Sequence, residues 1–373
     1  MRVLAIDVGT GTQDMLLFDS DGPVENSVQL IMPSPTLRIA QQVRAATAAG
    51  QAVVLHGVLM GGGPCHWAIN DHLQAGLPVY ATSAAARTFD DDLEKVQASG
   101  ITLIDDEARA DYAQAATEIE LRDLDLPAIN AALHAFGVEP DWDVLAVAVF
   151  DHGHAPPDVS DRKFRFDYLA ERLHNQGWLT DLAFTRSEIP AAMTRLQAVA
   201  ASAPPNAALV VMDTAPAAVL GALDDPFVSQ HEQVIIANIG NFHALAFHLG
   251  SGAQQSNGHH TIRGLFEHHT GELQPEQLLA FIERLSRGTL TNAEIFGSQG
   301  HGALILDPAA AKDALVATTG PRQAFLQHGL NGAPPYRAVP HGDMMLAGCY
   351  GLLRAVAAKL PEHRQAIQRS LGQ

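Results

Sequence analysis

Short apolar segments separated by glycine-rich or polar turns dominate the hydropathy pattern along the chain. Residues 2–6 and 15–19 are apolar runs on either side of the turn 7–14. This pattern predicts a β-hairpin whose turn is built from glycine and threonine. Residues 233–237 and 243–249 form a second pair of apolar runs around another glycine turn. The sequence therefore predicts two strand–turn–strand units, about 230 residues apart.

Further strands and helices are predicted around these two hairpins. Apolar runs predict strands at residues 27–32, 52–59, 144–150 and 208–212. Helical patterns cover residues 35–49, 166–175, 187–201 and 213–223, with Ser34 as the N-cap of the first. Residues 90–122 are acidic and alanine-rich, and we expect them to be helical and peripheral. The order of elements predicts an α/β protein with two halves.

Composition limits the function classes that need to be considered. At 373 residues with 47% hydrophobic content, the chain is long enough for about two domains with sizeable cores. A formal net charge of −18 argues against a nucleic-acid partner and against an anionic membrane surface. The N-terminal residues have no signal-peptide pattern, and no apolar run approaches the roughly 18 residues that span a bilayer. We therefore expect a soluble, cytoplasmic protein.

The first glycine turn has the composition of a phosphate-binding loop. Its residues are Gly9, Thr10, Gly11, Thr12 and Gln13. Glycines let the backbone approach a ligand closely, and the N–H groups and threonine hydroxyls of such a turn can converge on an anion. Asp7, at the end of the preceding strand, is well placed to hold a hydrated Mg²⁺ against a phosphate. The alternative is a tight hairpin without a ligand.

Five segments in order resemble the signature of one superfamily of ATPases. Residues 7–19 and 238–241 resemble its two phosphate loops, 213–218 and 342–351 its two connecting helices, and 314–321 its adenosine motif. The superfamily comprises the actin-like proteins, the heat-shock chaperones and the sugar kinases. Within it, the chain resembles a group labelled pyruvate formate-lyase-activating-like. Activating enzymes of that name need a three-cysteine cluster loop, whereas this chain has only Cys65 and Cys349, so we do not expect a radical enzyme.

The resemblance implies a fold and a division of the chain. It implies an α/β fold with two ribonuclease-H-like, actin-like ATPase domains around a central nucleotide cleft. The first domain would cover residues 1–225, with an insertion at about 63–205, and the second residues 226–373. Helix 342–359 would pack back toward the first domain. ATP and Mg²⁺ are the implied cofactors, and the partner would be an unidentified small molecule or protein.

The resemblance also assigns roles to individual residues. The phosphate-binding residues would be Gly9, Thr10, Gly11, Thr12, Gln13, Asn238, Gly240 and Asn241. Thr319, Gly320 and Pro321 would bind adenosine, and Asp7 and Asp14 would bind Mg²⁺. Phosphoryl transfer depends on charge neutralisation and positioning, and Asp213 would be the general base. Asp213 also precedes a predicted helix, so an N-cap is the alternative role for its carboxylate.

Two departures from the superfamily pattern keep alternative functions open. Many relatives carry aspartate where this chain has Asn238, and an amide brings no negative charge to Mg²⁺. Sugar kinases often place a cationic residue where this chain has Asp14. The main hypothesis is a small-molecule phosphotransferase or an ATPase that drives a partner. The alternative is a non-catalytic scaffold or regulator with a degenerate nucleotide cleft.

Histidine supplies a third hypothesis. The chain has 18 histidines, and several occur in close pairs. Asp151, His152 and His154 follow a predicted strand directly and are candidate ligands for a transition metal, since imidazole suits Zn²⁺ and Fe²⁺. A histidine-based metallohydrolase is therefore possible. The competing interpretation is that most of these histidines are surface or hydrogen-bonded core residues.

Overall fold

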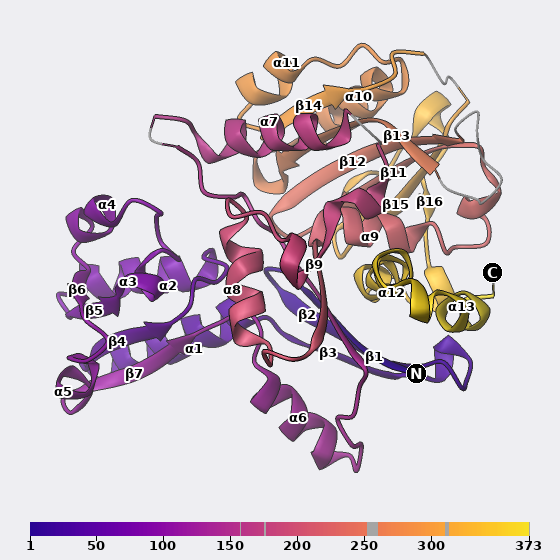
Figure 1. The fold of residues 1–373 in the computed structure, drawn as a ribbon. Coiled ribbons are helices and arrows are strands. Elements are labelled where there is room, and N and C mark those ends of the chain that lie inside the picture. The colour runs from indigo at the N-terminus through magenta and orange to yellow at the C-terminus, as the bar shows by residue number, and fades with distance from the viewer. Residues whose placement is uncertain (157, 175–176, 252–259, 310–312, 373) are drawn as a thin grey trace.

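In a computed structural model, the chain folds into three β-sheets with helices packed around them (Figure 1). The structure describes residues 1–156, 158–174, 177–251, 260–309 and 313–372. Two sheets have six strands each and the third has four. The protein therefore has a mixed α/β fold, in agreement with the expected class.

The first sheet is built around the predicted N-terminal hairpin. Its strand order is β3-β2-β1-β8-β10-β9. The strands are β1 (Arg2–Val8), β2 (Thr12–Asp19), β3 (Val28–Pro33), β8 (Val144–Val149), β9 (Ala183–Thr185) and β10 (Ala208–Asp213). β1, β2 and β3 pair antiparallel in sequence order, whereas β8 pairs parallel with β1, and β10 with β8. The predicted hairpin is confirmed.

The second sheet repeats this arrangement around the second predicted hairpin. Its order is β14-β13-β12-β11-β15-β16. The strands are β11 (Gln233–Ile239), β12 (His243–Ser251), β13 (His260–His269), β14 (Gly302–Ile305), β15 (Leu315–Thr319) and β16 (Tyr336–Arg337). Again three consecutive strands pair antiparallel, and a later strand, β15, pairs parallel with the first of them. Five strands of each sheet therefore correspond in order and direction, and each sheet has one further edge strand without a counterpart, β9 in the first and β14 in the second.

Two helices with small residues lie between the six-stranded sheets, α9 (Thr214–Ala222) and α12 (Ala347–Lys359) (Figure 1). They touch without side chains between them: a Cβ added to Gly221 would lie 1.8 Å from the Ala347 carbonyl oxygen. A Cβ added to Gly351 would lie 1.9 Å from the carbonyl oxygen of Ala217. One buried cluster joins both helices to the facing sides of both sheets. This crossing fixes the position of one sheet relative to the other.

The third sheet belongs to a separate part of the structure that lies beside the first sheet (Figure 1). Its order is β6-β5-β4-β7, with all strand pairs parallel. The strands are β4 (Ala52–Gly57), β5 (Val79–Thr82), β6 (Thr102–Ile104) and β7 (Ala116–Leu121). Helices α1 (Pro35–Ala48), α2 (Pro64–Gln74) and α3 (Ser83–Ala86) share its core. This sheet begins before residue 63, and β8, within the expected insertion 63–205, belongs to the first sheet.

The helical prediction for residues 90–122 is wrong in part. Only α4 (Leu93–Ala98) and α5 (Arg109–Ala113) are helical, and β6 and β7 occupy much of the rest. β7 pairs along its whole length with β4 and buries Ile119 and Leu121. Burial in a sheet outweighs the helix propensity of an alanine-rich segment, because propensity is a weak preference that tertiary packing overrides.

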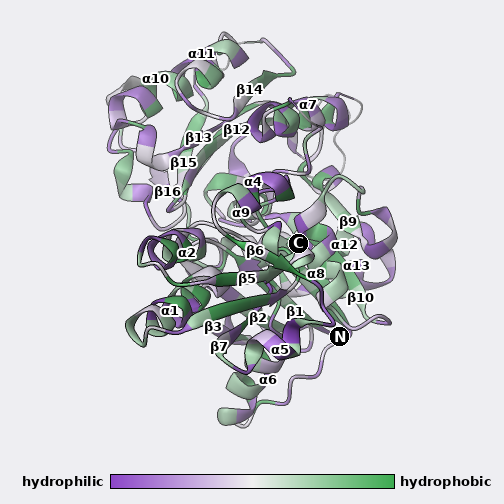
Figure 2. Ribbon diagram, turned by 90° about the vertical axis from the view of Figure 1, so that its left-hand side faces the viewer, coloured by the Kyte–Doolittle hydropathy of each residue, from purple (hydrophilic) through white to green (hydrophobic). Residues whose placement is uncertain are grey.

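The remaining helices are α6 (Leu126–Ala135), α7 (Asp161–Leu173), α8 (Thr194–Ser202), α10 (Pro275–Ser286), α11 (Asn292–Gly297) and α13 (Pro361–Ser370). Among them, α6 and α8 pack on the other face of the first sheet and α10 and α11 on the other face of the second, whereas α7 and α13 join the buried cluster between the two sheets. α8 begins seven residues later than the predicted helix at 187, because Pro190 cannot continue a helix from the preceding turn. α7 and α10 carry both hydrophilic and hydrophobic residues (Figure 2). Among the described residues, none of the helices combines the length and the apolar character needed to cross a membrane.

Candidate functional site

The two predicted phosphate loops have the same backbone geometry. In the first, the Gly9 N–H donates to the Thr12 carbonyl oxygen at 2.9 Å, and in the second the Gly240 N–H donates to the His243 carbonyl oxygen at 2.9 Å. Each loop joins the first two strands of its six-stranded sheet. The loops face each other closely, because a Cβ added to Gly11 would lie 2.4 Å from an Asn241 side-chain nitrogen.

A cleft of about 460 Å³ lies between these loops. Residues from all five segments of the sequence signature line it. The lining residues from these segments are Asp7, Val8, Gly9, Thr10, Gly11, Thr12, Asp14, Thr214, Ala215, Ala218, Asn238, Gly240, Asn241, Thr319, Gly320, Pro321, Met344, Met345, Ala347 and Gly348. The fold thus brings together segments that are up to about 340 residues apart in the sequence.

Gln13 is the one predicted loop residue that does not line the cleft among the described residues. Successive side chains of a strand point to opposite faces, so Gln13 faces away from the side shared by Thr12 and Asp14. Its amide instead donates to the Pro33 carbonyl oxygen at 3.1 Å. The predicted adenosine residues adjoin the second loop, since a Cβ added to Gly320 would lie 2.4 Å from Asn238 Oδ1.

Two buried carboxyl groups lie side by side at the base of the first loop. Asp7 and Asp14 are cross-strand partners in the hairpin. Burial, opposed in part by a hydrogen bond from Thr214, raises the pKa of Asp7 to about 7. Burial and the charge of Asp7 raise the pKa of Asp14 to about 8. Asp14 Oδ1 is buried without a hydrogen-bond partner among the described residues, so a cation bound there would displace no hydrogen bond of this oxygen.

The approach of α12 to Asp7 depends on one glycine. A Cβ added to Gly348 would lie 1.9 Å from Asp7 Oδ2, so only glycine leaves room for this carboxylate. The other oxygen, Oδ1, accepts a hydrogen bond from the Thr214 hydroxyl at 2.5 Å. Carboxylate oxygens are the protein ligands that Mg²⁺ prefers, and Asp7 and Asp14 can hold this ion next to the phosphate loops.

Asp213 occupies the N-cap position of α9, where its carboxylate accepts from the Ala215 N–H at 3.1 Å. The same carboxylate forms an ion pair with Arg165 at 2.7 Å. In the described part of the chain, Asp213 is not among the residues that line the large cleft. The N-cap role is therefore present in the structure, whereas the role of general base stays a prediction.

Asp151, His152 and His154 do not converge on one point. The Asp151 carboxylate accepts hydrogen bonds from the backbone N–H groups of Gly153 and Leu196, both at 2.8 Å. His154 Nδ1 lies 3.1 Å from an Asp91 carboxylate oxygen. His152 points elsewhere and lies against His301, with 3.1 Å between their Nε2 atoms. The three neighbouring side chains therefore point to different partners, and the predicted ligand set is not assembled as a unit.

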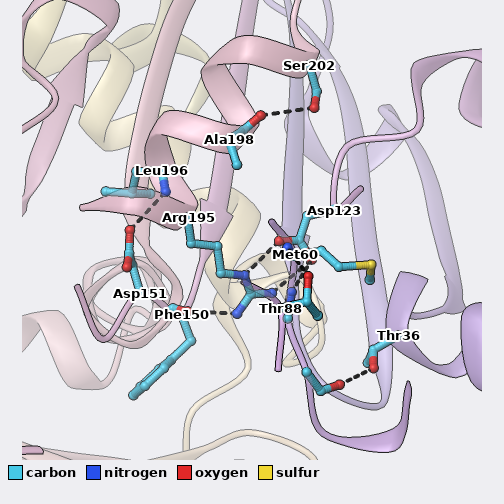
Figure 3. Close-up of polar contacts among 12 residues, drawn as sticks. Thr36, Met60, Thr88, Asp123, Phe150, Asp151, Arg195, Leu196, Ala198 and Ser202 are labelled. Carbon is cyan, nitrogen blue, oxygen red and sulfur yellow. Dashed lines mark hydrogen bonds and ion pairs between the residues drawn. The ribbon is translucent and has the colours of Figure 1, made fainter. Parts of the chain in front are cut away.

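A second wall of the cleft comes from residues that the sequence did not single out. Segments 59–63 and 87–91, which belong to the part of the structure that holds the third sheet, also line the cleft, and Gly63 adjoins Thr10 of the first loop. A buried ion pair ties this region to α8: Arg195 Nε donates to Asp123 Oδ2 at 2.7 Å (Figure 3). Arg195 also donates to the Phe150 carbonyl oxygen at 2.7 Å. No sequence motif marks this pair, because its two residues are 72 positions apart.

Comparison with known proteins identifies a family. The family model described as "Putative pyruvate format-lyase activating enzyme (DUF1786)" matches residues 60–325. The chain belongs to this family. No curated protein matches the chain in sequence. A solved structure described as an exopolyphosphatase-like protein aligns with 99% of this chain and 90% of its own, at 9% identity and a TM-score of 0.27. A TM-score this low supports no argument about fold or function.

Proposed function

We propose that this member of the family binds Mg-ATP in the cleft between its two six-stranded sheets. One observation carries the proposal: two glycine loops with the same hydrogen bond, from corresponding strands of two sheets that share five strands in order and direction, face each other across the cleft. This duplication supports two ribonuclease-H-like, actin-like ATPase domains, at residues 1–225 and 226–373. The loops would hold the phosphates through backbone N–H groups, as oriented amides do in other anion sites.

The metal and the adenosine have separate places in this proposal. Asp7 and Asp14 would hold Mg²⁺, which neutralises two buried carboxylates and brings positive charge to the β- and γ-phosphates. Thr319, Gly320 and Pro321 would contact the adenosine, beside the second loop. The part of the structure that holds the third sheet would then contact the acceptor of the transferred phosphoryl group, because its segments 59–63 and 87–91 line the same cleft. The acceptor would be a small molecule, or a protein partner that the ATPase drives.

The cysteines support this choice over the activity in the family description. Cys65 and Cys349 are the only cysteines in the chain, and each is buried in a different hydrophobic cluster. An iron–sulfur cluster held by cysteines needs more ligands than one chain of this protein can supply. Phosphate-based chemistry at the cleft requires no cysteine.

Calorimetric titration of the purified protein with ATP tests the proposal. We expect binding with Mg²⁺ present and much weaker binding in EDTA. Asp7→Asn should weaken Mg-ATP binding by at least about tenfold, since an interaction with a charged group contributes about 1.5–3 kcal/mol. Asp21→Asn, at an exposed carboxylate, is the matched control and should bind as the wild type does. Absence of wild-type binding at millimolar Mg-ATP would refute the proposal.

A binding protein without turnover is the second candidate function. The contacts of Asp213 favour it, because this carboxylate is held by Arg165 and by the start of α9, and it is not among the described residues that line the cleft. Phosphate release by the wild type separates the two candidates. Release that disappears in Asp213→Asn, while Mg-ATP binding persists, would support the phosphotransferase or ATPase. Mg-ATP binding without any release above background would support the scaffold or regulator.

A further inference from the structure

Three histidines from distant segments converge at one end of the cleft. His152 follows β8, His243 is the first residue of β12, and His301 directly precedes β14. One ring nitrogen from each lies within 4.8 Å of those of the other two. His152 and His243 line the cleft, whereas His301 is buried behind them, with 1% of its surface exposed. The cluster therefore joins the first sheet to the second.

One spacing within the cluster matches that of two ligands on a metal ion. Nitrogen ligands at the usual Zn–N distance in a tetrahedral site lie about 3.3–3.4 Å apart. The Nε2 atoms of His152 and His301 are 3.1 Å apart, close to this value. The competing explanation is a hydrogen bond between two neutral rings, in which one Nε2 carries the proton and the other accepts it. That explanation accounts for the contact between His152 and His301 and does not involve His243.

Neighbouring side chains pack against two of the rings. The ring of Phe150 stacks on His243, with 4.1 Å between ring centroids and 3° between planes. A Glu267 carboxylate oxygen lies 3.4 Å from His301 Nδ1 without a hydrogen bond between them, and both atoms are buried without a hydrogen-bond partner among the described residues. A carboxylate hydrogen-bonded to the second ring nitrogen is the usual outer partner of a metal ligand, and Glu267 lies next to that position without making this bond.

We propose that His152, His243 and His301 bind one divalent transition-metal ion, such as Zn²⁺, Co²⁺ or Fe²⁺, at the wall of the cleft. Three nitrogen ligands distinguish this site from the oxygen-rich site proposed for Mg²⁺ at Asp7 and Asp14. Three protein ligands leave a fourth position, as in catalytic zinc sites. Because two of the ligands line the cleft, this position is open to a water molecule or to an anionic oxygen of the acceptor. The site does not depend on ATP binding.

Titration with Co²⁺ tests the metal site directly. The full chain, purified without a histidine tag and stripped with a chelator, should bind one equivalent of Co²⁺ with the visible absorption of a low-coordinate nitrogen site. Zn²⁺ should displace the cobalt and remove the absorption. His243→Ala and His152→Ala should each weaken Co²⁺ binding by at least about tenfold, the smallest loss expected even for an outer partner.

Two control variants make the result specific. His134→Ala, at an exposed histidine on α6, should bind Co²⁺ as the wild type does. His154→Ala should also leave binding unchanged, since His154 contacts Asp91 and not the cluster. Absence of stoichiometric Co²⁺ binding by the wild type, or equal binding by the cluster variants, would overturn the proposal. X-ray absorption of the wild-type cobalt protein counts the imidazole ligands without relying on variants that could misfold. Fewer than three imidazole ligands would also overturn the proposal.

The Mg-ATP titration provides an independent outcome. It is carried out on the chelator-stripped wild type with Mg²⁺ alone restored. Mg-ATP binding without Co²⁺ binding would refute only the histidine site, and Co²⁺ binding without Mg-ATP binding would refute only the nucleotide cleft.

Discussion

Substitution of Asp14 by asparagine should change how the stability of the metal-free protein depends on pH. Burial and the neighbouring Asp7 raise the pKa of the Asp14 carboxyl from 3.8 to about 8. The folded protein therefore favours the protonated form. This contribution to stability is complete below the ordinary pKa and is lost as the pH rises toward and through about 8.

The size of the effect follows from proton linkage. Between about pH 6 and about pH 8, the unfolded chain has released the Asp14 proton, whereas most of the folded protein still holds it. The free energy of unfolding should then fall by about 2 kcal/mol over this interval because of this one group. Asparagine resembles the protonated carboxyl and has no proton to lose. The stability of Asp14→Asn relative to the wild type should therefore rise by about 2 kcal/mol from about pH 6 to about pH 8.

Urea unfolding in EDTA at both pH values measures this difference. The matched control is Asp21→Asn, at an exposed carboxylate, for which the difference from the wild type should not change with pH. A difference for Asp14→Asn that is independent of pH would refute the reasoning. Saturating Mg²⁺ should reduce the pH effect in the wild type, because a cation bound to Asp7 and Asp14 stabilises their ionised forms.

Two further substitutions test the packing that holds the cleft together. Gly221→Ala should lower the free energy of unfolding by about 3 kcal/mol, since its Cβ would lie 1.8 Å from a backbone oxygen of α12. The control in urea unfolding is Gly271→Ala, whose Cβ would meet open space. Equal effects of the two substitutions would contradict the close crossing of α9 and α12. Arg195→Met should lower the free energy of unfolding by about 3–5 kcal/mol, because this substitution leaves the Asp123 carboxylate, 2% exposed, without its cation. Adding Asp123→Asn to that variant should recover part of the loss, and a loss below about 1 kcal/mol in the single variant would show that the pair is not buried as described.

Local patterns were sufficient for the parts of the cleft that are made within short segments. Each predicted phosphate loop is a hairpin whose two strands adjoin it in sequence, so apolar runs and glycine placement determine it without help from distant residues. The helix prediction at 213–223 is confirmed for a similar reason, since Asp213 caps a run of small, apolar residues. Residues 90–122 were predicted wrongly because the pairing of β7 with β4 depends on a strand about 60 residues away.

Hydropathy and glycine placement along the chain predicted the two hairpins and the α/β class, and the resemblance to the ATPase superfamily pointed to five of the segments that line the cleft. Only the tertiary structure decided which side chains meet across it: Arg195 with Asp123, Asp213 with Arg165, and His152 with the two later histidines. Each of these sets joins residues at least 48 positions apart. Sequence patterns report periodicity within one element, whereas such contacts arise from the way whole sheets and helices pack, a result of burying apolar surface over the entire chain.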